Sequence, residues 1–174
     1  MKKKALIVID VQKDYFPGGN LTLNNAEQTL NQILIAVEKA KSQNMPVFLI
    51  QHIVPAGQGP APFFNEGTSG ANIHPRLLEL LSDAPIVIKT FADSFQETSL
   101  SDLIRESGID ELLICGMMTQ HCVTHTTLSK AADDYIVNVL ADACTTVDEL
   151  VHNIALQGLS SHANIVTVDQ AFSY

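Results

Sequence analysis

The sequence predicts an α/β domain in which a parallel sheet lies between two layers of helices. Strand-like aliphatic runs alternate with amphipathic helical patterns along the whole chain. The first run, Ala5–Ile9, is apolar at every position, as expected for a strand that helices cover on both faces. The 174 residues contain no repeat or linker, so we assign residues 1–174 to one domain.

Six runs have the length and composition of buried strands, and they span residues 5–9, 46–51, 86–88, 111–115, 136–140 and 165–168. Helical spacing predicts five helices, at residues 26–43, 74–81, 99–107, 119–133 and 146–160. Asn24 or Asn25 is the expected cap of the first helix. Residues 52–73 are rich in Gly, Pro, Asn and Ala, and such a long irregular segment is usually functional.

Composition excludes several classes of protein. The net charge of −9 and the pI of about 4.9 disfavour nucleic acids and anionic membranes as partners. The apolar run near the N-terminus meets Asp10 after five residues, which is too short for a signal peptide, and no stretch is long enough to span a bilayer. Three cysteines do not form a disulfide framework, so we expect a cytoplasmic protein.

Three reactive side chains stand directly after predicted strands. Asp10 follows the first strand, Lys89 the third, and Cys122 lies beyond the fourth at the start of a predicted helix. Ligands of open α/β sheets bind beyond the carboxyl ends of the strands, so the three groups are expected at one edge. A helix N-terminus and Lys89 both favour a thiolate, while Asp10 is placed to accept the thiol proton.

Each of these residues also has a purely structural interpretation. Cys122 can be a small buried hydrophobic residue, Asp10 a turn cap, and Lys89 a surface lysine. The occurrence of three suitable groups at three strand ends favours a catalytic site over three independent structural roles.

The segments that carry the trio resemble the isochorismatase-like cysteine hydrolases. Residues 6–16 resemble the family pattern of an aliphatic strand followed by Asp-x-Gln-x-Asp-Phe. Residues 116–123 resemble the nucleophile loop, Gly-x-x-Thr-x-x-Cys-Val, and residues 88–95 resemble the lysine segment, Lys-x-x-x-Ser-x-Phe. Residues 142–146 with His152 are similar to the late strand and helix, so the resemblance spans nearly the whole chain.

The resemblance implies a catalytic triad of Asp10, Lys89 and Cys122 that cleaves a small, non-peptide amide through a thioester. It also implies a cis peptide between Met117 and Met118, with the N–H groups of Met118 and Cys122 forming the oxyanion hole. The implied fold is a three-layer, Rossmann-like α/β/α domain with six parallel strands in the order 3-2-1-4-5-6. Members are often homodimers or homotetramers.

The resemblance also bears on the pocket and on metals. Nicotinamidases of this family bind a metal through Asp-x-His and a second histidine. The matching stretch here is residues 49–53, where Gln51 and His52 do not reproduce the pattern because no Asp stands two residues before a His, so we predict no metal and no cofactor. His52 and His74 remain candidates for ligands, pocket walls or local caps. The predicted pocket residues are Gln12, Phe16, Phe63, Phe64, Thr119 and His121. The segment 55–71 either covers the site or lies at a subunit interface.

Other functions fit the sequence less well. A catalytically silent module in an assembly would not need all three reactive groups, and a nicotinamidase-type amidase lacks its metal motif. A thiol redox protein would carry a Cys-x-x-Cys pair. A flavodoxin-like nucleotide-binding protein would carry a glycine pattern after the first strand, where residues 10–19 have none.

Overall fold

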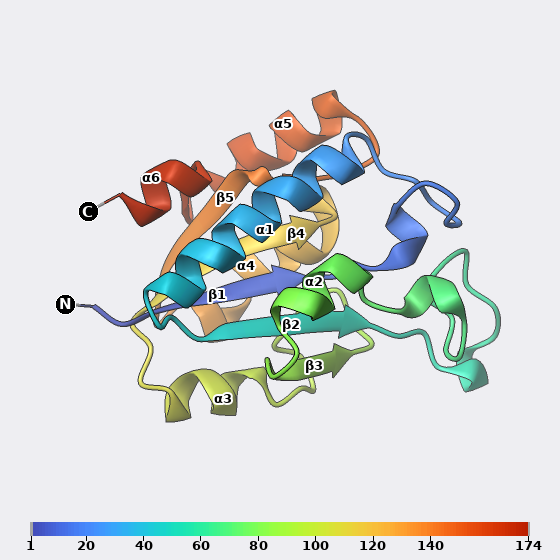
Figure 1. The fold of residues 1–174 in the computed structure, drawn as a ribbon, viewed down its shortest axis with the longest axis horizontal. Coiled ribbons are helices and arrows are strands. Elements are labelled where there is room, and N and C mark those ends of the chain that lie inside the picture. The colour runs from blue at the N-terminus through green and yellow to red at the C-terminus, as the bar shows by residue number, and fades with distance from the viewer. Residues whose placement is uncertain (1, 174) are drawn as a thin grey trace.

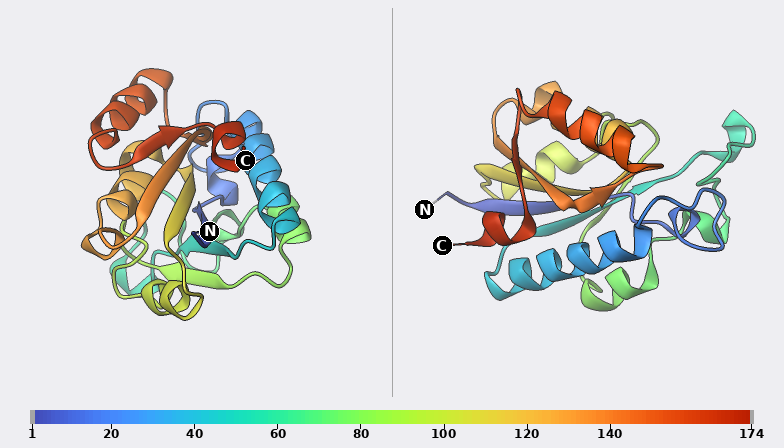
Figure 2. Two further views of the ribbon diagram at one scale, coloured as in Figure 1. Left: turned by 90° about the vertical axis from the view of Figure 1, so that its left-hand side faces the viewer. Right: turned by 90° about the horizontal axis from the view of Figure 1, so that it is seen from above.

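The computed structural model describes residues 2–173 and shows a six-stranded sheet between two layers of helices (Figure 1). All neighbouring strands are parallel, and their order is β3-β2-β1-β4-β5-β6, which confirms the predicted fold. Helices α1, α2 and α6 cover one face of the sheet, while α3, α4 and α5 cover the other (Figure 2). None of the helices in the described part of the chain is long and apolar enough to cross a membrane.

The six predicted strands are all present. They are β1 (Lys4–Ile9), β2 (Val47–His52), β3 (Ile86–Lys89), β4 (Glu111–Met117), β5 (Ile136–Thr145) and β6 (Asn164–Val166). The prediction ended β5 at residue 140, but the strand continues through polar residues to Thr145. A register shift between Ile114 and Gly116 lets this second half of β5 pair with the end of β4.

The helices depart more from the predictions. They are α1 (Ala26–Ser42), α2 (Pro75–Leu80), α3 (Leu100–Glu106), α4 (Thr124–Thr127), α5 (Glu149–Leu159) and α6 (Val168–Phe172). Asn25 is at the N-cap position of α1, as predicted, but it adopts a left-handed conformation and its side chain makes no capping hydrogen bond. The start of α5 is three residues later than predicted, because Asp148 is extended and accepts a hydrogen bond from Val151 N–H. Helix α6 was not predicted.

The single helix predicted over residues 119–133 is also wrong. The chain forms a π-helical turn at Thr119–Val123, then the single-turn α4, and then a 3-10 turn at Lys130–Ala132. Three threonines in four residues disfavour a long helix. Ser129 then adopts an extended conformation and caps the next turn with its side chain, which ends the helical run.

Strands β1 and β4 approach most closely where the predicted site begins. Gly116 has a φ of +124°, and a Cβ atom built there would lie 2.0 Å from the carbonyl oxygen of Ile9. Only glycine fits this position without moving the backbone. The contact fixes the spacing between the end of β1, which leads into Asp10, and the end of β4, which leads into Met117.

Candidate active site

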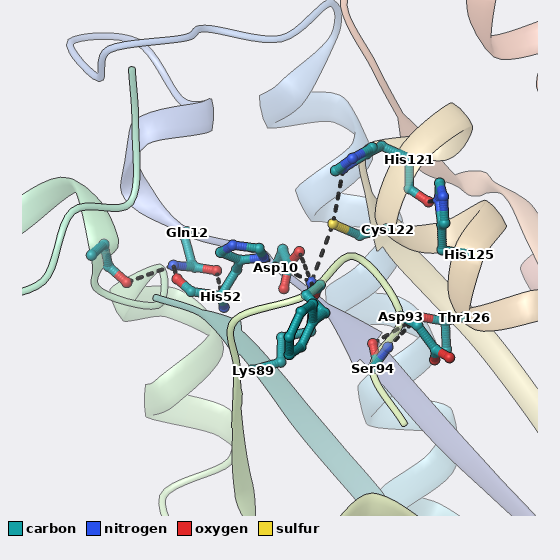
Figure 3. A network of polar contacts seen from close by, with 12 residues as sticks. Asp10, Gln12, His52, Lys89, Asp93, Ser94, His121, Cys122, His125 and Thr126 are labelled. Carbon is teal, nitrogen blue, oxygen red and sulfur yellow. Dashed lines mark hydrogen bonds and ion pairs between the residues drawn. The ribbon is translucent and has the colours of Figure 1, made fainter. Parts of the chain in front are cut away.

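The structure brings Asp10, Lys89 and Cys122 together at the carboxyl edge of the sheet (Figure 3). Lys89 Nζ lies 2.9 Å from Asp10 Oδ2 and 3.2 Å from Cys122 Sγ. All three residues are at most 2% exposed. Asp10 has a left-handed φ of 51°, which turns the chain away from β1, and its N–H donates to Ile50.

The Lys89 ammonium has four neighbours but hydrogen-bonds only three of them. It donates to Cys122 Sγ, to the carbonyl of Phe91 at 3.0 Å, and contacts His52 Nδ1 at 3.0 Å. Its contact with Asp10 is an ion pair that lacks hydrogen-bond geometry, so both oxygens of this buried carboxylate are without a hydrogen-bond partner among the described residues. A buried acceptor without a donor is uncommon, and here it lies beside a thiol.

Burial and neighbouring charges shift the pKa values of Lys89 and Cys122. Burial disfavours the ammonium of Lys89, but the neighbouring Asp10 and Cys122 outweigh this, and the pKa of Lys89 is raised. Burial and the Asp10 carboxylate raise the pKa of the Cys122 thiol, and Lys89 offsets only part of this rise. Lys89 favours the thiolate, as expected from the sequence, but burial and Asp10 outweigh it, and the pKa of the thiol is raised. Cys122 therefore rests as a thiol between the Asp10 carboxylate and a permanent cation.

The two flanking imidazoles are neutral. Burial and then Lys89 lower the pKa of His52 to about 4. Burial, His125 and Lys89 lower the pKa of His121, whose Nδ1 lies 3.4 Å from Cys122 Sγ on the exposed side of the site. Among the predicted pocket residues, His121 is the one in direct contact with the sulfur.

The peptide bond between Met117 and Met118 is cis, as the family resemblance predicted. Met118 is buried, and its carbonyl accepts hydrogen bonds from the N–H groups of His121 and Val123. Thr119, which follows, is also buried, and its hydroxyl bonds His152 Nδ1 at 2.8 Å. Thr119 therefore links the nucleophile loop to α5, and its hydroxyl is already paired.

Gln12 lies next to the site, but its side-chain amide hydrogen-bonds to the backbone of other segments. Its Nε2 donates to the carbonyls of His52 at 2.8 Å and Ala71 at 2.7 Å, while its Oε1 accepts from the N–H of His52 at 2.8 Å. Gln12 is completely buried. Gln12 thereby connects the chain that follows β1 to the end of β2 and to Ala71, at the end of the segment of residues 55–71.

The predicted aromatic walls fall into two places. Phe63 and Phe64 pack with Tyr15, and the Phe64 ring lies 6.0 Å from that of His52. Phe64 is buried in the chain's own core, so it is not available to a subunit interface. Phe16 lies apart, with its ring 4.5 Å from the ring of His74.

The Asp14 carboxylate holds residues 55–71, the covering segment, in place. Asp14 is buried and accepts from the N–H of Phe64 at 2.8 Å and of Asn20 at 3.1 Å. A Cβ atom on Gly70 would lie 2.0 Å from Asp14 Oδ1, so glycine is needed for this approach. The sequence marked Asp14 only as part of a family pattern, and its contacts reveal the structural role.

The residues that match the nicotinamidase metal site do not fit a metal. Gln51 donates its side-chain N–H to the carbonyl of Ala71, and Ile53 has no ligand atom. His74 is the N-cap of α2 and accepts from Arg76 N–H on Nδ1, which is the local cap considered for it from the sequence.

A second group of metal-ligating atoms, from Asp10, His52 and Cys122, lies within 4.8 Å of one another. The Lys89 ammonium already contacts all three of these residues, and a second cation there would meet its charge. We derive no step through a metal.

Comparison with known proteins places this site in a family. The family model described as the isochorismatase domain matches residues 4–170. The chain belongs to the isochorismatase family. Over 142 residues it is 35% identical to the isochorismatase family protein YddQ of Bacillus subtilis, covering 82% of this chain and 77% of that protein.

Two further relatives connect the family to enzymes. The nicotinamidase of Escherichia coli is 28% identical, with 85% of each chain covered. The structure of the pyrazinamidase of Pyrococcus horikoshii in complex with zinc superposes with a TM-score of 0.85 at 26% identity, covering 95% of this chain and 99% of that one. The chain is accordingly a hydrolase of the isochorismatase family.

Proposed function

We propose that this protein hydrolyses a small, non-peptide amide through a thioester on Cys122. The observation that carries the proposal is the buried Asp10 carboxylate, which has no hydrogen-bond donor among residues 2–173 and lies beside a thiol whose sulfur accepts a bond from the Lys89 ammonium. Amide hydrolysis by the nicotinamidase among its relatives supports the substrate class. The departure from the metal motif at Gln51 and His52 favours an amidase that is not of the metal-dependent nicotinamidase type.

The proposed reaction begins when Asp10 accepts the proton of Cys122 and the thiolate attacks the amide carbonyl. The N–H groups of Met118 and Cys122 are the proposed donors to the oxyanion. The tetrahedral intermediate then breaks its C–N bond, and the amine leaves with the proton held by Asp10. Throughout, Lys89 remains charged and stabilises whichever of Asp10 and Cys122 carries the negative charge.

Water completes the cycle. Asp10 takes a proton from water as the hydroxide attacks the thioester carbonyl, and the acid leaves as the C–S bond breaks. The proton returns to the sulfur, which restores the resting thiol. His121 is exposed and its Nδ1 lies 3.4 Å from Cys122 Sγ, so we assign it to substrate selection, together with Phe63 at the partly exposed end of the aromatic cluster.

The proposed setting is the cytoplasm, with the protein as a homodimer or homotetramer. All three cysteines are free, which agrees with a reducing compartment. On α5 the side chains of Leu150 and Ile154 are 70% and 61% exposed, which provides an apolar face for a second subunit.

The test is the rate at which iodoacetamide labels Cys122 between pH 5 and 9, followed by intact mass. We expect the wild-type rate to be nearly constant from about pH 6 to 8, because the fraction of thiolate is set by transfer of the thiol proton to Asp10. Asp10→Asn removes the carboxylate that raises the pKa of the thiol while Lys89 stays, so its profile should lose the flat region and rise about tenfold with each pH unit up to the lowered pKa. Cys122→Ala should remove the labelled site.

One outcome contradicts the proposal. If wild-type Cys122 follows the profile of an ordinary thiol of pKa about 8.5, and Asp10→Asn changes nothing, the chain is a catalytically silent member of the family. A wild-type profile of the expected form makes a screen of small amides the next step, with Cys122→Ala as the blank.

A further inference from the structure

The end of β2 places a histidine on the catalytic lysine. His52 is half-buried, and its Nδ1 lies 3.0 Å from Lys89 Nζ (Figure 3). An ammonium has three N–H donors and no acceptor, so Nδ1 accepts this bond and the imidazole proton resides on Nε2. The neutral state of His52 agrees with this assignment.

The backbone of His52 is held on both sides. Gln12 accepts from the N–H of His52 and donates to its carbonyl, each at 2.8 Å. The Phe64 ring packs near the imidazole, and Phe64 is in turn fixed by Asp14. An element held this firmly can direct the lysine without moving during the reaction.

The Lys89 ammonium makes as many hydrogen bonds as it has N–H groups. Three N–H groups face three acceptors, which are His52 Nδ1, the Phe91 carbonyl and Cys122 Sγ. Asp10 Oδ2 is the nearest neighbour of Nζ at 2.9 Å, yet it receives no hydrogen bond. Lys89 therefore stabilises the Asp10 carboxylate through its charge, while its three N–H groups donate to the other three acceptors.

We propose that His52 is a positioning residue for the proton transfer, because it holds one N–H of Lys89 and thereby keeps the Asp10 carboxylate free to accept the thiol proton. With the Phe91 carbonyl holding a second N–H, the third is directed to the sulfur that becomes negative. The proton moves from Cys122 to Asp10, the negative charge moves from Asp10 to Cys122, and Lys89 keeps its three protons. This inference rests on the proposed hydrolase function.

Removal of the imidazole acceptor has a defined consequence. In His52→Phe the released N–H can turn to Asp10 Oδ2, which lies within reach, and a charge-assisted bond there weakens the carboxylate as a base. His52→Asn keeps an acceptor near the position of Nδ1. The titratable groups facing residue 52 are Lys89, Asp10 and His121 in both variants, so the acceptor is the feature that differs.

The experiment compares the iodoacetamide reaction of Cys122 in wild type, His52→Phe and His52→Asn across pH 5 to 9. We expect the flat region of the profile to fall about tenfold or more in His52→Phe, with its flat shape retained, and to stay within about threefold of wild type in His52→Asn. Thermal unfolding of each variant reports whether the fold is intact. A purely structural role would lower stability without separating the phenylalanine and asparagine variants in this way.

A measurement on the wild type covers the possibility that His52→Phe does not fold. The nitrogen NMR shifts of His52 at pH 7 report which ring nitrogen carries the proton, and the proposal requires Nε2. A proton on Nδ1, or equal rates in wild type and His52→Phe, would overturn the inference while leaving the hydrolase proposal intact. An ordinary-thiol profile in the wild type would instead remove the hydrolase proposal itself.

Discussion

Two cysteines at the same edge of the sheet show what separates a nucleophile from a buried thiol. Cys122 lies beyond β4 and Cys144 near the end of β5, and both are almost completely buried. Burial raises the pKa of Cys144 to about 12, with a backbone bond from Gly116 opposing this rise, and burial also raises the pKa of Cys122. The pKa values alone therefore do not distinguish them.

The difference lies in the neighbours. Cys122 has a carboxylate to take its proton and an ammonium that donates to its sulfur. Cys144 has Asp142 near it, and no cation in the described part of the chain affects its pKa, so a second negative charge there would not be balanced. A buried thiol becomes a nucleophile where the proton has a short path to a base and the charge remains balanced.

The largest effect should come from breaking the charge balance at Cys122. Lys89→Met leaves the Asp10 carboxylate buried without its cation, and we expect a loss of about 3–5 kcal/mol in the free energy of unfolding at pH 7. The double variant Asp10→Asn with Lys89→Met should recover most of this loss, because neither residue is then charged. Urea unfolding measures both. A cost below about 1 kcal/mol for Lys89→Met would show that Asp10 is not an unpaired buried charge in that variant.

A smaller effect should follow from loosening the segment of residues 55–71 that Asp14 holds in place. Asp14→Asn replaces one oxygen that accepts from a backbone N–H by an amide donor, and we expect a cost of about 1–3 kcal/mol in the free energy of unfolding. The matched control is Asp134→Asn, which removes an exposed carboxylate and should cost less than about 0.5 kcal/mol. Equal costs in the two variants would remove the proposed role of Asp14.

The smallest effect is expected at the other thiol. Cys144→Ala should leave the labelling rate of Cys122 within about twofold of wild type at every pH, since sites without shared partners act independently. In the native wild type, brief labelling should give one adduct. Peptide mapping that finds Cys144 modified as fast as Cys122 would contradict the distinction between the two sites.

The sequence predicted the sheet and its reactive edge because both depend on local patterns. Apolar runs mark buried strands, and a residue that follows a strand must lie at its carboxyl end, which brought Asp10, Lys89 and Cys122 into one prediction. His52 also follows a predicted strand, and the same reasoning applied to residue 52 would have placed it beside Lys89. It was considered instead as a metal ligand, a pocket wall or a cap.

The missed features depend on contacts that the sequence does not display. The direction of the pKa shift at Cys122 follows from complete burial beside Asp10, which spacing along the chain does not reveal. The second half of β5 exists because of a register shift against β4. Gln12 was predicted to line a pocket, but its hydrogen bonds to the backbone of residues 52 and 71 require the folded arrangement of three segments.

Gly116 has a consequence for how this protein can change. Because the main chain of β4 touches that of β1 at this glycine, the separation between base and nucleophile is set by two backbones and not by the side chains around them. Mutations elsewhere in the core can alter stability while the reacting atoms keep their spacing. We therefore expect substrate specificity to change through substitutions in the segment that covers the site. Mutant libraries for altered specificity should vary residues 55–71 and keep residues 9, 10 and 116 constant.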